Sequence, residues 1–238
     1  GRAHHRHFVC TAGHEQHAGG GGFWLNRGGG GGVELVAGGL VVGRVKTMNY
    51  EMFERSMQDL HSEYKEEFSQ IFQIQDDIGV VLRLHLLTEQ VVENFICAVC
   101  NQPNMFWFIE GKNESKITVS YDHKLKIAKT LGLPDAVYKV FQRLNTMRNK
   151  LAHRIGHGTI DSGALEGLMD VVKNEIEPKM GTPLSKTWWL DFNELGEIKS
   201  QLFFVDAESD CGKLALLVRY TFIYFIVTAF DKFGRTQN

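Results

Sequence analysis

Cysteine is scarce in this 238-residue chain, and no secretory signal is recognisable. Only four residues are cysteines, and two of them, Cys10 and Cys211, stand alone. Cys97 and Cys100 have C-x-x-C spacing, but they lie in an apolar helical pattern without the second pair that a zinc site would need. These features favour buried thiols over metal or redox chemistry, and we expect a reducing, cytoplasmic location.

Basic residues are too few for a protein that coats nucleic acid. The chain has 26 Lys and Arg against 28 Asp and Glu. Residues 1–47 hold five of the basic and two of the acidic residues, so the remainder has 21 and 26, a net charge of −5. Non-specific binding requires neutralisation of many phosphates. No helix-turn-helix pattern that would read DNA is present either. The negative net charge still allows a transient RNA substrate to bind in a small cleft.

The chain has one long apolar run, from Leu214 to Phe230. Arg219 interrupts this run, which is shorter than the ~20 residues that a membrane span needs. We therefore expect a central or interface helix and no membrane partner.

Glycine, by contrast, is abundant and unevenly distributed. More than half of the 25 glycines precede Met48, in runs at 19–22 and 28–32, and five histidines lie among them. Such a segment loses much backbone entropy on ordering, so we expect residues 1–47 to be a disordered tail. Because the composition changes abruptly at Met48, we interpret the tail as non-native upstream or vector-derived sequence. A histidine-rich metal-binding tail is the alternative, although its spacings fit no ligand template.

The sequence from Met48 onward is helical in pattern. Helices are expected over 50–73, from Asp76 or Asp77 to about Cys100, over 122–131 and 134–155, from Asp161 or Ser162 to about Pro178, and over 211–233. A loop at 103–120, with a short strand at 117–119, and a looser stretch around Trp188 separate them. The prediction is an all-α bundle of about five to six helices over residues 48–238.

Residues 148–153 contain the strongest candidates for catalytic side chains. Arg148 and His153 lie ~140° apart around a helix, and Asn145, Asn149 and Ala152 fill the arc between them. Arginine grips phosphate oxygens in a fork, and histidine both takes and gives a proton near neutrality. This combination suits RNA cleavage without a metal or cofactor.

The opposite face of the same helix is apolar, with spacings of three and four that predict burial against the core. Its residues are Val137, Val140, Leu144, Met147 and Leu151. The polar arc is therefore left for solvent, a partner or a substrate. The alternative is that Arg148 and Lys150 solvate a helix end while His153 interacts with its C-terminal dipole.

The stretch Met147 to His153 resembles the R-N-x-x-A-H form of the Rx4-6H signature of HEPN domains (higher eukaryote and prokaryote nucleotide-binding). Residues 84–96, 124–128 and 131–133 are similar to the preceding helices of several HEPN families, among them the mannitol operon repressor family. The resemblance extends over about 76–155, and more loosely to about 233. It implies a HEPN-like helical bundle that dimerises with the two signatures facing each other.

Active HEPN members cleave RNA. The resemblance implies that His153 of this chain would act in acid/base cleavage and that Arg148 would support the phosphate. HEPN toxins that a nucleotidyltransferase silences typically carry a tyrosine two residues after the histidine, where this chain has Ile155. Members similar to the mannitol repressor are regarded as regulators rather than nucleases.

Further candidates come from the second helix and the loop after it. His85 and Glu89 lie one turn apart, so the carboxylate could orient the imidazole, and either group could face the helix over 134–155 across the bundle. The alternative is an ordinary i,i+4 pair. The aromatic residues 106–108 could stack bases, although packing or a dimer contact is favoured.

Two functions follow from these patterns. The first is a metal-independent endoribonuclease of HEPN type, a toxin or defence effector, with Arg148 and His153 catalytic and Asn149, His85 and Glu89 supporting. The second is a non-catalytic transcriptional regulator resembling the mannitol repressor. The expected partners are RNA, a second copy of the chain, and an antitoxin or regulatory protein.

Overall fold

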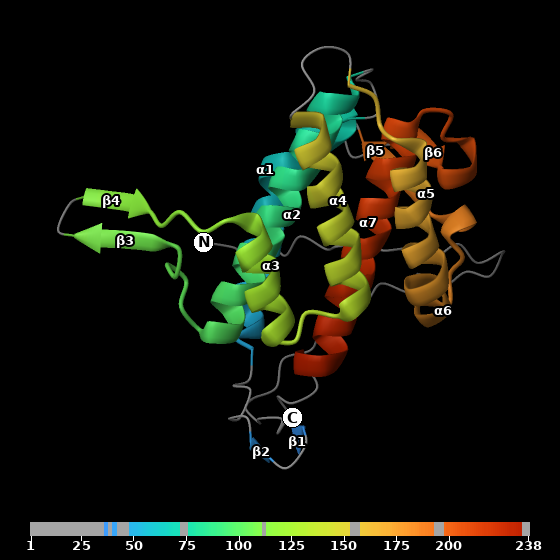
Figure 1. The fold of residues 1–238 in the computed structure, drawn as a ribbon. Coiled ribbons are helices and arrows are strands. Elements are labelled where there is room, and N and C mark those ends of the chain that lie inside the picture. The colour runs from blue at the N-terminus through green and yellow to red at the C-terminus, as the bar shows by residue number, and fades with distance from the viewer. Residues whose placement is uncertain are drawn as a thin grey trace, which may run out of the picture.

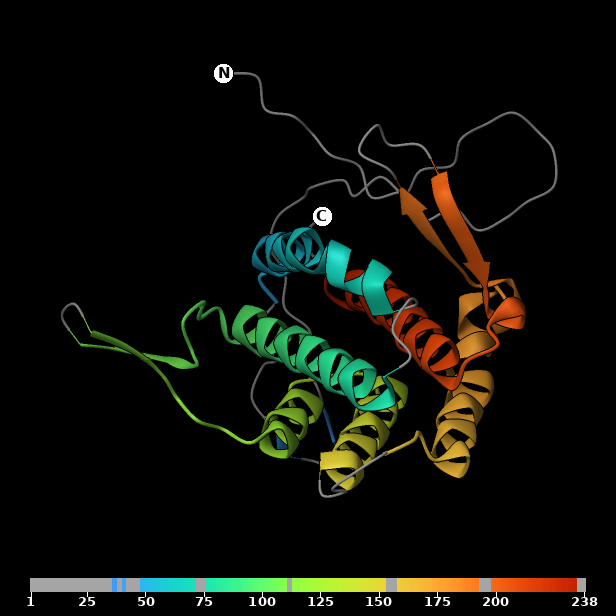
Figure 2. The same cartoon turned by 90° about the horizontal axis from the view of Figure 1, so that it is seen from above.

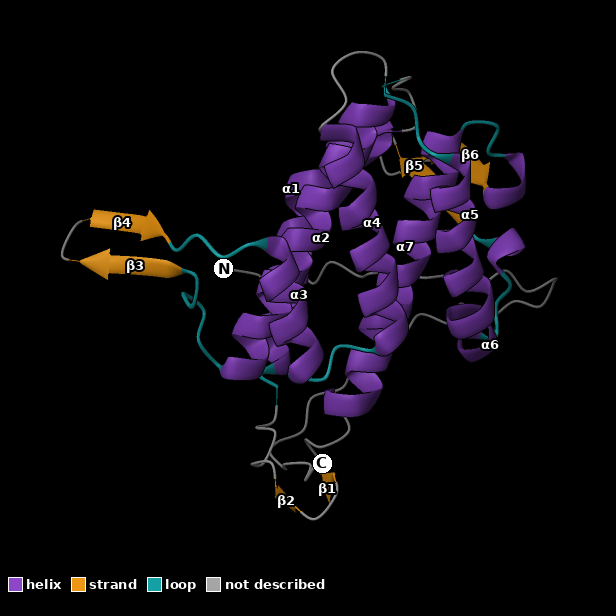
Figure 3. Ribbon diagram, in the orientation of Figure 1, coloured by secondary structure: helices purple, strands orange, loops and turns teal. Residues whose placement is uncertain are grey.

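The computed structural model describes residues 36–37, 40–41, 48–71, 76–110, 113–152, 158–192 and 198–234. Its main helices are α1 (Tyr50–Ile71), α2 (Asp77–Cys100), α3 (Tyr121–Thr130), α4 (Asp135–Ala152), α5 (Ser162–Val171), α6 (Glu177–Met180) and α7 (Asp210–Ala229). Short antiparallel hairpins lie at the edge of this helical body (Figure 1, Figure 3).

Helix α2 is the centre of the bundle and packs against α1, α3, α4 and α7. Figure 2 shows α1 on one side of it and α3 and α4 on the other. The helix begins where the Asp76 carboxylate accepts a hydrogen bond from the Ile78 amide at 3.1 Å. It ends at Asn101, whose left-handed φ of 52° closes the last turn. Because α2 is covered on several sides, even its polar residues must find partners inside the protein.

The start of α1 is tied to the end of α2. The Asn49 side chain accepts from the Met52 amide at 2.9 Å and donates to the Asn101 Oδ1 at 2.8 Å. Met48 is fully buried in the core. The residue at which the composition of the sequence changes is therefore part of the hydrophobic core.

Aromatic side chains join α1, α2 and α7. Phe53, Phe95 and Phe225 meet edge to face, with ring centroids 5.4 to 6.4 Å apart. Among the described helices, α7 with its short C-terminal extension is the one that is long and apolar enough to cross a membrane. Most of its side chains lie inside the bundle, as a central helix requires.

Helix α4 shows the expected two faces. The five residues of its predicted apolar stripe, Val137, Val140, Leu144, Met147 and Leu151, are all buried. Arg148, Asn149 and Asn145 lie on the other side, half-buried or exposed. The expected end of this helix, at about 155, falls among residues 153–157, which lie outside the described residues.

The fifth helix is longer than predicted. Asp161 caps α5 by accepting from the Gly163 amide at 3.0 Å, and a π turn (Val172–Ile176) continues it into α6. The end was predicted near Pro178, and the helix runs two residues further, to Met180, because this proline lies in the first turn after the π segment, where it is tolerated. Gly181, which has a φ of 67°, caps this end.

Two hairpins after Met48 were not predicted. Strands β3 (Trp107–Glu110) and β4 (Asn113–Lys116) pair antiparallel and extend away from the helices (Figure 1). The expected strand at 117–119 was wrong: aromatic strand formers at Trp107 and Phe108 place the ladder earlier, although the Ile117 amide still donates to the Phe106 carbonyl at 2.8 Å. The stretch around Trp188 was expected to be irregular, but β5 (Trp188–Phe192) pairs with β6 (Ile198–Phe203).

The prediction of an all-α bundle of about five to six helices is confirmed: α1, α2, α3, α4, the continuous α5 to α6 segment and α7 build one hydrophobic core. Of the expected tail, the strands β1 (Val36–Ala37) and β2 (Leu40–Val41) pair antiparallel. The rest of residues 1–47 lies outside the described residues.

Candidate functional site

Arg148 sits near the end of α4 with its guanidinium only partly satisfied. Its Nη1 donates to the Asn149 Oδ1 at 3.0 Å. Its Nε is buried and has no hydrogen-bond partner among the described residues. A buried donor without a partner is costly, and a charged one more so. The guanidinium is therefore a cation that an oxyanion would stabilise.

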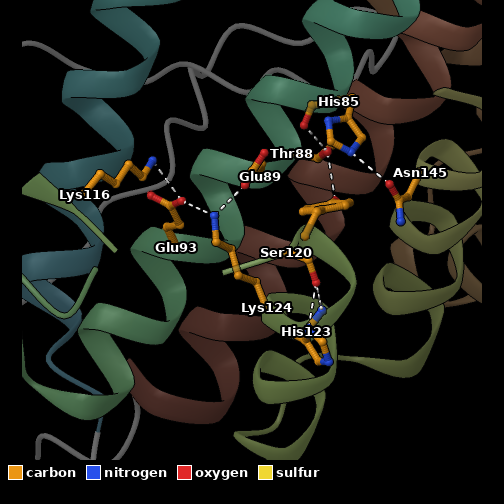
Figure 4. Close-up of polar contacts among 10 residues, drawn as sticks. His85, Thr88, Glu89, Glu93, Lys116, Ser120, His123, Lys124 and Asn145 are labelled. Carbon is orange, nitrogen blue, oxygen red and sulfur yellow. Dashed lines mark hydrogen bonds and ion pairs between the residues drawn. The ribbon is translucent and has the colours of Figure 1, made fainter. Parts of the chain in front are cut away.

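His85 faces this cation from α2. Only 5% of the residue is exposed, and its Nε2 lies 3.0 Å from the Asn145 Oδ1 on α4 (Figure 4). Because a carbonyl oxygen only accepts, Nε2 carries the proton in this arrangement. The His85 ring also packs edge-on against the Tyr121 ring, with centroids 4.5 Å apart. The imidazole thus bridges the two helices that surround the candidate site.

The pKa of His85 lies below its ordinary value. Burial is the main cause, and the nearby Arg148 and Lys124 cations act in the same direction. The hydrogen bond to Asn145 and the charge of Glu89 oppose the shift. His85 is therefore neutral at pH 7, so it donates to Asn145 without placing a second positive charge beside Arg148.

A chain of hydroxyl groups fixes the backbone around His85. The Tyr121 hydroxyl donates to the Thr88 Oγ1 at 2.9 Å, and the Thr88 hydroxyl donates to the His85 carbonyl at 2.8 Å. Thr88 and Tyr121 are both buried. This chain joins α3 to α2 and limits the positions that the imidazole can adopt.

Glu89 serves a different neighbour from the one expected. It was predicted to orient His85, but its Oε1 accepts from the Lys124 Nζ at 2.5 Å. Lys124, itself 2% exposed, also donates to Glu93 at 2.6 Å. Burial alone would lower the pKa of Lys124, but the hydrogen bonds to the two carboxylates outweigh it and raise that pKa above its usual range. Glu89 therefore belongs to an ion cluster that joins α2 to α3.

The same ion cluster fixes the base of the β3–β4 hairpin. Lys116, the last residue of β4, pairs with Glu93 at 3.0 Å. Phe106, the residue before β3, is buried, and the Lys124 Nζ lies 5.5 Å from the centroid of its ring. Both strands therefore leave the helical body from a charged anchor (Figure 4).

The structure brings three of the expected site residues to the α2–α4 region: Arg148, Asn149 and His85. Glu89 lies one turn along α2 from His85 and acts on it through its charge. His153 directly follows Ala152, the last residue of α4, and lies outside the described residues. Asn145 was placed in the polar arc but not among the site residues. Its spacing of three from Arg148 was the only signal for it in the sequence.

Comparisons with known proteins add no relative: no family model, curated protein or solved structure matches the chain. The similarity to HEPN domains therefore rests on the sequence and has no support from a matching relative.

The Lys124 cluster gives a test of stability. Replacing Lys124 with Met would leave Glu89 without its cation and the buried Glu93 with only the exposed Lys116 as its partner. We expect this to lower the free energy of unfolding by about 3–5 kcal/mol. Urea denaturation measures the change. Lys126→Met is the matched control, because Lys126 pairs with Asp122 on the exposed face of the same helix, where solvent screens the pair, so its loss of stability should be much smaller. Equal losses in the two variants would contradict the cluster's role.

The lowered pKa of His85 gives a test by pH. The folded state resists protonation of His85, whereas the unfolded chain accepts a proton near the ordinary pKa of 6.5. This contribution to stability is complete above that value and is lost as the pH falls through it toward the lower folded pKa. We expect the free energy of unfolding of His85→Gln to fall less between neutral and mildly acidic pH than that of the parent. Parallel curves for the two proteins would show that His85 titrates normally.

Proposed function

We propose that this protein is a metal-independent endoribonuclease of HEPN type, acting as a toxin or defence effector. The observation that carries the proposal is the half-buried Arg148 guanidinium, which keeps an unpartnered Nε beside a neutral His85. An arginine in this position binds a phosphate oxygen more strongly than one in water, because the surrounding protein screens charge less. The resemblance of residues 147–153 to the HEPN signature supports the same assignment.

The reaction needs one base, one acid and one cation. The base removes the proton from a ribose 2′-OH, and that oxygen attacks the adjacent phosphorus. The bond from phosphorus to the 5′-oxygen breaks, and the acid gives a proton to this leaving oxygen. Arg148 stabilises the charge that builds on the non-bridging oxygens. The products are a 2′,3′-cyclic phosphate and a 5′-hydroxyl.

His153 is the proton carrier in this proposal. It follows Ala152 directly, five positions after Arg148, and histidine is the side chain whose unperturbed pKa suits proton transfer near neutrality. One imidazole serves as base or acid within a turnover, so a second must come from elsewhere. His85 is buried and already donates to Asn145, which makes it a poor source of that proton. A second copy of the chain would supply the second His153.

A second candidate function has its own observation. The β3–β4 hairpin extends from the helical body, with 45% of Trp107 and 56% of Phe108 exposed. A two-stranded hairpin is marginally stable alone, and exposed aromatic residues on such an arm favour a protein contact. This is the feature expected of a non-catalytic regulator resembling the mannitol repressor, or of an effector held by an antitoxin.

Cleavage assays decide between the two functions. We expect the parent to cut RNA in the presence of EDTA and to leave cyclic-phosphate ends. Arg148→Ala should lower the rate about 100- to 1,000-fold, and His153→Ala about 100- to 10,000-fold. Arg143→Ala is the control, because Arg143 is an exposed arginine on the same helix, and this variant should cut like the parent. A folded parent that cuts no RNA would favour the regulator.

The need for two imidazoles predicts a homodimer. A two-fold interface brings the same surface of each chain together, so both copies of the α4 polar arc would line one cleft. Light scattering at micromolar concentration should report about twice the chain mass of 26.9 kDa. A monomer with full cleavage activity would exclude the shared cleft.

A further inference from the structure

The polar face of α4 offers hydrogen-bond donors and almost no acceptors. Asn145, Arg148 and Asn149 are spaced i, i+3 and i+4, so their side chains share one face of the helix. The Asn145 oxygen accepts from His85, and the Asn149 oxygen accepts from Arg148. Each amide has therefore turned its carbonyl toward a protein donor. The N–H groups of both amides are left, together with the remaining N–H groups of the guanidinium.

These donors have no partners within the part of the chain that the structure describes. Among the described residues, the side-chain hydrogen bonds of Asn145 and Asn149 engage only their oxygens, and the buried Nε of Arg148 is unpaired. In Figure 4 the amide nitrogen of Asn145 lies on the side away from His85. A surface with one positive charge and several free donors fits a ligand that has only acceptors and a negative charge. A phosphodiester oxygen has this chemistry.

The orientation of Asn145 depends on His85. Without a donor at Nε2, the amide could rotate and present its carbonyl oxygen to a phosphate, which would repel it. His85 is buried and held by the Tyr121 ring, so its contact with a ligand is through Asn145. The charged groups around it are Glu89 on its own helix, Lys124 on α3 and Arg148 on α4. Burial, with a smaller contribution from the two cations, keeps the ring neutral, and the proton on its Nε2 keeps the amide turned.

We propose that Asn145 binds a non-bridging phosphate oxygen of RNA next to Arg148, and that His85 is the positioning residue that directs its amide outward. This inference rests on the proposed function and deepens it. It assigns a substrate-binding role to a residue outside the Arg148 to His153 motif. It also makes His85 a support for binding, with no part in the proton transfer.

The test uses a ligand that cannot be cleaved. A fluorescent RNA oligonucleotide with every 2′-hydroxyl methylated lacks the attacking group but keeps its phosphates. Anisotropy at low ionic strength measures its dissociation constant, because surface electrostatics are least screened there. We expect Asn145→Ala to weaken binding about 10- to 100-fold, the range for a hydrogen bond to a charged group. Gln142→Ala removes an exposed amide from the same helix and should bind like the parent.

The role of His85 is tested by two replacements. Glutamine places an N–H near the position of the imidazole Nε2, so His85→Gln should keep the affinity. His85→Leu removes the donor and should weaken binding as much as Asn145→Ala does. The double variant His85→Leu with Asn145→Ala should be no weaker than either alone, because both changes remove one function. Additive losses would show that His85 does not act through Asn145.

The outcomes separate this inference from the proposed function. If the parent binds the methylated RNA and Asn145→Ala weakens binding, the inference stands even where unmodified RNA is not cut. If the parent cuts unmodified RNA but Asn145→Ala binds the methylated RNA like the parent, the inference is wrong and the nuclease assignment survives. A folded parent that does not bind the methylated RNA at micromolar concentration would overturn the inference. If His85→Leu does not fold, Asn145→Ala, His85→Gln and Gln142→Ala still decide the result.

Discussion

The hydrogen bond from His85 to Asn145 is the contact on which the candidate site depends. It crosses the interface between α2 and α4, where almost every other side chain is apolar. A buried imidazole without a partner would destabilise this interface, so the bond also fixes how the two helices face each other. The Tyr121 ring and the Thr88 hydroxyl hold the imidazole from the α3 side. The position of α4 and the orientation of Asn145 are thus set by the same contact.

The buried and half-buried charges of this region lie in two places, the Lys124 cluster and Arg148. The Lys124 cluster with Glu89 and Glu93 is closed, since each buried charge there meets an opposite one. Arg148 is different, because its nearest described partner is the neutral Asn149. A closed cluster stabilises the packing of α2 on α3, whereas an unpaired cation attracts an anion from outside. This contrast is the physical basis for locating the phosphate site on α4 and for treating Glu89 as structural.

The sequence predicted the helices well because their apolar residues repeat every three or four positions, as the buried stripe of α4 shows. It predicted less well where long-range contacts decide the structure. The pairing of Trp188 with Phe203 joins residues with no shared local pattern. The spacing of His85 and Glu89 suggested that they bond each other, but Lys124 lies 35 positions from Glu89 and only the fold brings it there. Asn145 was placed in the polar arc, but its contact with His85 was not predicted for the same reason, since the two residues lie 60 positions apart.

The most direct test of the account is nuclear magnetic resonance of the Arg148 side chain. The guanidinium Nε–H is buried and unpartnered in the described structure, so it should respond strongly when a phosphate arrives. Titration with the methylated RNA should shift the Arg148 Nε–H signal and the Asn145 side-chain amide signals together, with one dissociation constant. Signals at both positions that stay unchanged while RNA binds elsewhere would contradict a phosphate site on α4.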